Sequence, residues 1–290
     1  MSEDKTLEKI QSVIERFDAP FFFYNLDKLK SHLEYMSDGL DPDIKLWYAC
    51  KANPASAILK VLRNLGFGID VASTGELHQV LNNGIDSQNV LATGPAKSKD
   101  YLRHLVKSGV QTIVLESQSQ AIWLNEVAVE LNQKVDCLLR VQLDWDEGKS
   151  VLGGDDITPF GISSDEWKEL QFGDLTNLNI RGYHVFQWGN ILELGQLESI
   201  WTKTIEKVLE LSIDIGIECE VLDLGGGLGV HYDFEGVNID FKDVQKILVD
   251  LKNKYKLNKI WMELGRYTVA ECGIYLTKII DKKKARGQDI

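Results

Sequence analysis

The sequence predicts a closed (β/α)8 barrel, because eight short apolar runs alternate with segments of helical periodicity. Turn residues bound the apolar runs, which are read as strands at residues 46–50, 68–71, 90–93, 112–115, 137–141, 180–186, 221–224 and 260–263. The helices predicted between them lie at residues 56–65, 75–83, 99–108, 118–131, 194–215 and 240–255. Eight alternations favour a closed barrel, and an open doubly wound sheet is the alternative.

Residues typical of helix ends support these assignments. Ser98 and Ser117 stand where N-caps are expected, because a serine oxygen can accept a hydrogen bond from a free backbone N–H of the first turn. Glycines follow four of the predicted helices, where a left-handed residue commonly ends a helix: Gly66, Gly84, Gly109 and Gly216.

Two strand-like segments lie outside the eight repeats. The first is residues 20–24, before the first βα unit, and the second is residues 274–280, after the last one. We expect them either to pair with each other or to belong to a further sheet. The segment that follows, residues 281–290, carries too few apolar residues for a core of its own.

Composition excludes several classes of protein. The chain of 290 residues has a net charge of −12 and a pI near 5.0, which argues against nucleic acid or an anionic membrane as a partner. The four cysteines are far apart and form no metal-ligand pattern, so we expect reduced core thiols and no metal site. The sequence shows neither a signal peptide nor an apolar run of roughly 20 residues, and predicts a cytoplasmic protein.

Lys51 follows the first predicted strand, so its amine is expected at the carboxyl end of the barrel. Burial against an apolar wall disfavours an ammonium group, and a lysine that loses its proton can attack an aldehyde to form a Schiff base. Considered alone, Lys51 is better explained as a solvated lysine at a strand end, and the rest of the sequence must support the Schiff base.

Other polar groups follow the later strands and should therefore meet Lys51 at one mouth of the barrel. Three glycines, Gly225, Gly226 and Gly227, follow the seventh strand, where backbone N–H groups can converge on a phosphate. Arg266 follows the eighth strand and can add a bidentate contact to the same anion. The alternative is a turn in which glycine is selected for packing.

Two carboxylates, Asp70 and Glu263, are expected to be buried at the mouth, where they need a cation such as a protonated ring nitrogen. Structural salt bridges are the alternative. His184 and Phe186 offer a flat surface for a planar ligand, and we expect only one of the two to face the lumen. Together the lysine, phosphate nest, acid and planar surface indicate pyridoxal 5'-phosphate.

Five blocks also occur in the order found in a known family. They are YACKAN at 48–53, DVASTGEL at 70–77, Arg140-Val141 with FGI at 160–162, DLGGG at 223–227, and ELGR at 263–266. The chain resembles the fold type III pyridoxal-phosphate enzymes, whose barrel is like that of alanine racemase, and among them the ornithine and diaminopimelate decarboxylase group.

The resemblance implies a role for each block. Lys51 is implied to form the Schiff base, and Asp70 and Glu76 to orient the site around it. Glu263 is implied to pair with the pyridine nitrogen, with His184 beside it as a further catalytic residue. The remaining cofactor contacts are implied for Arg140, Phe186, Gly189, the three glycines at 225–227, Gly265 and Arg266.

The sequence departs from the family at three positions. Trp188-Gly189 stands where relatives have a Gly-Ser pair whose hydroxyl binds phosphate, so the backbone N–H groups of Gly189 and Asn190 are expected to substitute. Phe186 replaces a ring-stacking histidine, which predicts apolar stacking. Leu264 replaces a proline.

The segment KARG at 284–287 resembles the start of the family's second, β-rich domain. We therefore expect residues 1–25 to be a helix and strand of that domain, 26–273 to be the cofactor-binding barrel, and 274–290 to be the start of the truncated β domain. The predicted activity is decarboxylation of an amino acid or amine-bearing carboxylate, weak or absent in this short form, with a homodimer expected of a full-length form. The alternatives are a non-catalytic cofactor-binding barrel, a Schiff-base aldolase and, less well supported, a racemase.

Overall fold

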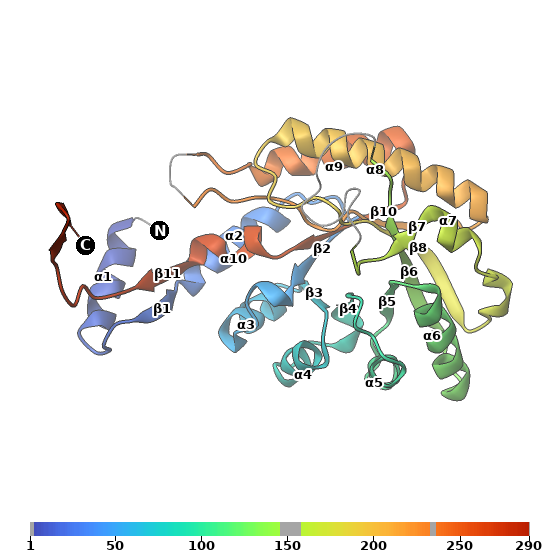
Figure 1. Ribbon diagram of the computed structural model, residues 1–290, viewed down its shortest axis with the longest axis horizontal. Helices are drawn as coiled ribbons and strands as arrows, with labels where there is room; N and C mark the ends of the chain where they lie inside the picture. Colours follow the sequence, from blue (N-terminus) through green and yellow to red (C-terminus); the bar gives the residue numbers. More distant parts are fainter. Residues whose placement is uncertain (1–2, 146–157, 233–235, 290) are drawn as a thin grey trace.

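The computed structural model describes residues 3–145, 158–232 and 236–289, which form a closed barrel of eight parallel strands surrounded by helices (Figure 1). Pairing of β5 with β6 closes the sheet, so the predicted barrel is confirmed and the open sheet is wrong. The barrel strands are β2 (Ile44–Ala49), β3 (Gly68–Val71), β4 (Val90–Ala92), β5 (Thr112–Leu115), β6 (Val135–Gln142), β8 (Leu178–His184), β9 (Val221–Asp223) and β10 (Lys259–Leu264). The short β7 (Ile162–Ser163), which was not predicted, adds to β6.

The helices follow the predicted order with ends shifted by one residue at most. They are α3 (Ser56–Asn64), α4 (Thr74–Asn82), α5 (Lys99–Lys107), α6 (Gln118–Glu130), α8 (Leu194–Ile215) and α9 (Phe241–Tyr255). Ser98 and Ser117 accept hydrogen bonds from the first turns of α5 and α6, which confirms both N-caps. The four predicted helix-ending glycines all have φ between 69° and 80°, the left-handed conformation that glycine adopts without strain.

Two tryptophans contribute to one layer of the barrel interior. Trp47 and Trp261 meet edge to face at 5.1 Å and pack with Leu91, Val114, Leu138 and Val221. Gly68 makes room for them, since a Cβ there would lie 2.3 Å from the Trp47 ring. Lys45 lies over that ring at 3.7 Å, and burial lowers the pKa of its amine to about 8.

The two strands predicted outside the barrel do pair with each other. β1 (Phe21–Tyr24) runs antiparallel to β11 (Gly273–Leu276) and extends, with α1 (Glu3–Ile14), from one side of the barrel (Figure 1). The second strand ends at Leu276, earlier than predicted. Beyond it, β12 (Lys284–Ala285) and β13 (Gln288–Asp289) form a hairpin whose turn residues, Arg286 and Gly287, both have positive φ.

Three further α-helices are present: α2 (Leu26–Ser37) precedes β2, and the short α7 (Ser164–Lys168) and α10 (Arg266–Val269) follow β7 and β10. All four cysteines are free and buried, in agreement with the predicted core thiols. Among the described residues, none of the helices combines the length and apolar character that crossing a membrane requires.

Gly182 offers a test of the barrel packing. The pairing of β6 with β8 shifts its register beside Gly182, whose φ is 149° and whose Cβ, if present, would lie 2.0 Å from the carbonyl oxygen of Val221. We expect Gly182→Ala to lower the free energy of unfolding by about 2–3 kcal/mol through overpacking and backbone strain. Gly173→Ala is the control, because no atom lies within 4 Å of that Cβ position. Equal denaturant midpoints for the two variants would contradict this explanation.

Candidate active site

A cavity of about 360 Å³ opens at the carboxyl ends of β2, β8, β9 and β10. Eight of the predicted site residues line it: Lys51, Phe186, Gly189, Gly226, Gly227, Glu263, Gly265 and Arg266. The remaining lining residues are Ala49, Ala52, Asn190, Leu228, Leu264 and Tyr267. The structure therefore brings together groups that are more than 200 positions apart in the sequence.

Lys51 lies in a one-turn 3-10 helix, Cys50–Ala52, directly after β2. The Tyr48 hydroxyl donates to the Asn53 carbonyl oxygen at 2.9 Å and so fixes the start and end of this turn. The Lys51 side chain lines the cavity but is exposed, which corrects the prediction of a lysine buried against an apolar wall.

The glycine loop after β9 is shaped by close approach of neighbouring chain segments. A Cβ on Gly226 would lie 2.3 Å from the Glu263 carbonyl oxygen, and one on Gly225 would lie 2.6 Å from the Phe186 Cβ. Gly225 and Gly227 have φ of 62° and 104°, which disfavour other residues. Gly226 and Gly227 line the cavity, whereas the Gly225 N–H donates to Asp223 at 2.8 Å and shapes the turn.

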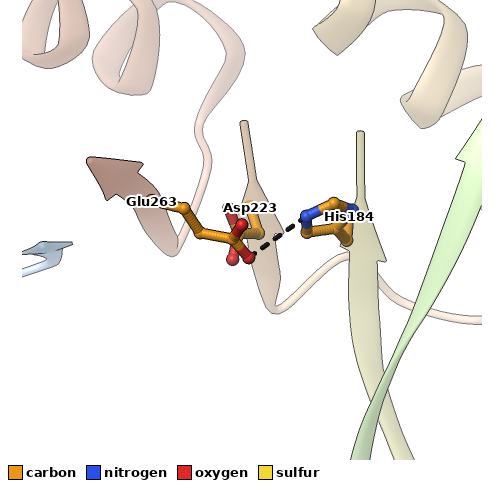
Figure 2. A group of neighbouring side chains, drawn as sticks. All are labelled: His184, Asp223 and Glu263. Atoms are coloured by element: carbon orange, nitrogen blue, oxygen red, sulfur yellow. Dashed lines mark ion pairs between the residues drawn. The ribbon is translucent and has the colours of Figure 1, made fainter. Parts of the chain in front are cut away.

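Three buried side chains from neighbouring strands lie together, and one of them, Glu263, also lines the cavity (Figure 2). Nε2 of His184, on β8, lies 3.1 Å from Oε1 of Glu263, on β10, and Asp223 ends β9 between them. One potential ligand atom from each residue lies within 4.8 Å of the others, a grouping that could in principle hold a metal ion. The sequence analysis did not predict this grouping.

The buried carboxyl groups of this region differ in acidity. Burial alone would raise the pKa of Glu263, but the effect of His184, followed by those of Lys51 and Arg140, outweighs it and lowers the pKa to about 2. Burial, with Glu263 as the second cause, raises the pKa of Asp223 and of Asp70 well above the usual range. The Thr93 hydroxyl donates to Asp70 at 2.6 Å. Glu263 is thus the most acidic of the three carboxyl groups.

His184 and Phe186 both belong to the inner side of the barrel mouth, so the expectation that only one faces inward is wrong. Residues two positions apart on a strand point to the same side. His184 contacts Glu263 in the buried layer, while Phe186 lies just past the end of β8 and lines the cavity. Its ring edge would lie 3.8 Å from a Cβ on Gly189, which places the aromatic surface against that loop.

Arg140 lies near the carboxyl end of β6 and belongs to a cluster of buried charged residues that the sequence analysis did not predict. Its guanidinium donates to both carboxylate oxygens of Glu116, at 3.0 and 3.3 Å, and lies 4.7 Å from the centre of the Phe160 ring. Glu116 also accepts from the Gly161 N–H at 2.9 Å and lies 3.9 Å from the Lys97 amine. Glu116 directly follows β5, so its position at a strand end is the sequence signal that identifies it.

Lys97 is a second lysine at this end of the barrel, with its side chain fully buried. Its amine donates to the Gly94 carbonyl oxygen. Burial lowers the pKa of Lys97 to about 8, and the neighbouring Glu116 acts in the opposite direction. Unlike Lys51, this lysine does not line the cavity.

Glu76 lies in the first turn of α4, outside the cavity lining. Its carboxylate accepts from the Ala72 N–H at 2.7 Å and holds the turn between β3 and α4. It is therefore placed to support the loop that follows Asp70.

The comparisons with known proteins agree with this geometry. Residues 26–270 match the pyridoxal-binding domain of the pyridoxal-dependent decarboxylases. The chain belongs to this family. The match confirms the predicted resemblance, the barrel and pyridoxal phosphate as the cofactor of the family.

Two curated relatives show how far the likeness extends. The chain is 25% identical to the L-glutamyl-[BtrI acyl-carrier protein] decarboxylase of Niallia circulans, over 97% of this chain and 67% of that protein. It is 30% identical to the diaminopimelate decarboxylase of Aquifex aeolicus, over 93% of this chain and 64% of that protein. The chain thus spans about two thirds of the length of these relatives.

A solved structure shows the same fold. The diaminopimelate decarboxylase of Helicobacter pylori complexed with L-lysine superimposes with a TM-score of 0.84 at 24% identity. The superposition covers 95% of this chain and 70% of that one.

The residues of this site fit the cofactor. The cavity holds an accessible amine at Lys51, an acid that stays charged at Glu263, and an arginine beside glycines at positions where a Cβ would collide with the neighbouring chain. These are the groups that an aldehyde, a ring nitrogen and a phosphate require.

Glu116 provides a test of the buried charge cluster. We expect Glu116→Gln to lower the free energy of unfolding by about 3 kcal/mol, because it leaves two buried cations without their carboxylate. Glu126→Gln is the matched control: its partner Lys99 lies at 2.6 Å but the pair is exposed, so the loss should stay within about 1 kcal/mol. Urea unfolding of both variants measures the difference, and similar losses would show that the cluster is not a stabilising unit.

Lys97 predicts a pH dependence of stability. The amine has a pKa of about 8 in the folded chain and 10.5 as its reference value, so between these values the unfolded chain holds a proton that the folded chain has released. Raising the pH through this window therefore favours the folded state. We expect the stability of the wild-type protein, measured against Lys97→Met, to increase from pH 8 to 10.5. A difference that stays constant would contradict the assignment.

Proposed function

We propose that this chain carries pyridoxal phosphate on Lys51 and serves the decarboxylation of an amino acid or amine-bearing carboxylate. The observation that carries the proposal is the single cavity lined by Lys51, the glycine loop, Glu263 and Arg266. Lys51 suits the cofactor's aldehyde, the glycine loop and Arg266 suit its phosphate, and Glu263 suits its ring nitrogen. The family match over residues 26–270 supports the assignment independently.

Each residue of the cavity then has a task. Lys51 attaches the cofactor aldehyde, and the N–H groups of Gly226 and Gly227 with the Arg266 guanidinium bind the phosphate. Phe186 offers an apolar face to the ring, and Gly189 and Gly265 let the backbone approach it closely. The cofactor, when bound, supplies a conjugated ring that accepts the electron pair of the broken carbon–carboxylate bond.

Glu263 acts on the ring nitrogen. A carboxylate with a pKa of about 2 remains charged beside that nitrogen and so favours its protonated form. Nε2 of His184 lies 3.1 Å from the Glu263 carboxylate. Burial raises the pKa values of Asp70 and Asp223, so Glu263 gives up its proton more readily than either of them.

Arg140, Asp70 and Glu76 are positioning residues in this proposal. Arg140 adds positive charge that helps to keep Glu263 ionised. Asp70 accepts from Thr93 at the strand beside Lys51, and Glu76 fixes the loop after Asp70.

The relatives suggest the substrate class. One acts on a glutamyl group carried by an acyl-carrier protein and another on diaminopimelate, and both substrates bear an amine beside a carboxyl group. We propose residues 26–273 as the cofactor domain, and residues 1–25 and 274–290 as parts of a second, β-rich domain. The antiparallel β1–β11 pair, which lies outside the barrel, supports this division. A homodimer is the assembly we propose for the whole protein.

Lys51 is tested by covalent labelling. After addition of pyridoxal phosphate and reduction with borohydride, we expect mass spectrometry to find the cofactor on Lys51 and to find none on Lys51→Ala. Lys45→Met is the control, because Lys45 also has a pKa of about 8 but lies at the opposite end of β2. It should label like the wild type. Label on Lys45 or Lys97 in place of Lys51 would overturn the assignment.

A further inference from the structure

Few of the side chains that line the cavity can donate a hydrogen bond. Among the described residues that line it, the side-chain donors are Lys51, Asn190, Arg266 and Tyr267. The Tyr267 hydroxyl already donates to the Ile239 carbonyl oxygen at 2.6 Å, and Lys51 is assigned to the aldehyde. Asn190 and Arg266 therefore remain as side-chain donors to a phosphate.

Backbone hydrogen bonds attach the loop containing Asn190 to the glycine loop. The Ile191 N–H donates to the Gly227 carbonyl oxygen at 2.8 Å, and the Gly229 N–H donates to the Ile191 carbonyl oxygen at 2.7 Å. Asn190 itself has a φ of 57°, a left-handed conformation that asparagine tolerates better than most residues. The two loops thus present Asn190 at the edge of the proposed phosphate nest.

The orientation of the Asn190 amide follows from its partner. Arg266 Nη1 donates to Asn190 Oδ1 at 2.6 Å. A guanidinium has donors only, so the amide oxygen must face it and the two N–H bonds of Nδ2 are directed elsewhere. Within the described part of the chain, none of the side-chain hydrogen bonds uses Asn190 Nδ2.

We propose that Asn190 is a phosphate-binding residue, which donates from Nδ2 to the anion while Oδ1 holds Arg266 beside the same anion. This inference rests on the proposed cofactor function and assigns a new residue to it. The pair supplies one positive charge and one neutral, polarised donor, which complements a phosphate that also accepts backbone N–H groups.

The test compares Asn190→Gly with Asn132→Gly. Glycine keeps the left-handed backbone of position 190, so the change removes the side chain without straining the loop. Asn132 is an equally exposed asparagine with a φ of 50°, after the end of α6 and outside the cavity, and is therefore a matched control. The dissociation constants of pyridoxal phosphate and of pyridoxal, which lacks the phosphate, are measured for both variants.

We expect Asn190→Gly to weaken pyridoxal phosphate binding about tenfold, the loss typical of one hydrogen bond to a charged group. Pyridoxal binding should not change. Asn190→Asp should weaken pyridoxal phosphate binding further, because its carboxylate removes the donor and repels the phosphate, while Asn132→Gly should behave as the wild type. Wild-type affinity of Asn190→Gly for pyridoxal phosphate, or an equal loss for both aldehydes, overturns the inference.

Inorganic phosphate separates this inference from the proposed function. If the wild-type protein attaches neither aldehyde to Lys51, the cofactor function fails, and Asn190 is then judged by phosphate alone at constant ionic strength. A rise in unfolding temperature with phosphate in the wild type and Asn132→Gly, reduced in Asn190→Gly, supports the assignment. An equal rise in all three proteins, or none in any, contradicts it.

Discussion

Closure of the parallel sheet between β5 and β6 is the constraint on which the site depends. It turns eight strand ends that are spread over more than 200 residues into neighbours at one mouth. An open sheet of the same strands would leave Glu116, which follows β5, and Arg140, which lies near the carboxyl end of β6, at opposite edges. Their buried contact at 3.0 Å exists only because the sheet is closed.

The same end of the barrel has an electrostatic problem, because three buried carboxyl groups, Asp70, Asp223 and Glu263, lie close enough to affect one another's pKa. Three buried negative charges would repel strongly. The pKa values of these groups move in opposite directions. Glu263, with His184 at 3.1 Å, has a pKa lowered to about 2, whereas burial raises the pKa values of Asp70 and Asp223.

Periodicity and strand-end position were sufficient to predict the barrel and its helices, and together with the family resemblance they predicted eight of the residues that line the cavity. They could not show that the Lys51 side chain is exposed, because the depth of the cavity depends on loops from four strands. The expectation that only one of His184 and Phe186 faces the lumen was wrong, because side chains alternate between successive residues and residues two positions apart share a face. Glu116 could have been predicted as a site residue, because it directly follows β5. The burial of Lys97 beside it could not, because it depends on tertiary packing that no local sequence pattern encodes.

Backbone contacts connect Glu263 directly to the glycine loop at 225–227. The Glu263 N–H donates to the Gly225 carbonyl oxygen at 2.7 Å, and the Glu263 carbonyl oxygen closes on Gly226, where any Cβ would collide with it. Glu263 and the glycine loop, which we propose to contact the ring nitrogen and the phosphate, therefore cannot move independently. A side chain on Gly226 would separate β9 from β10 and displace both groups at once, so the packing alone requires glycine at this position.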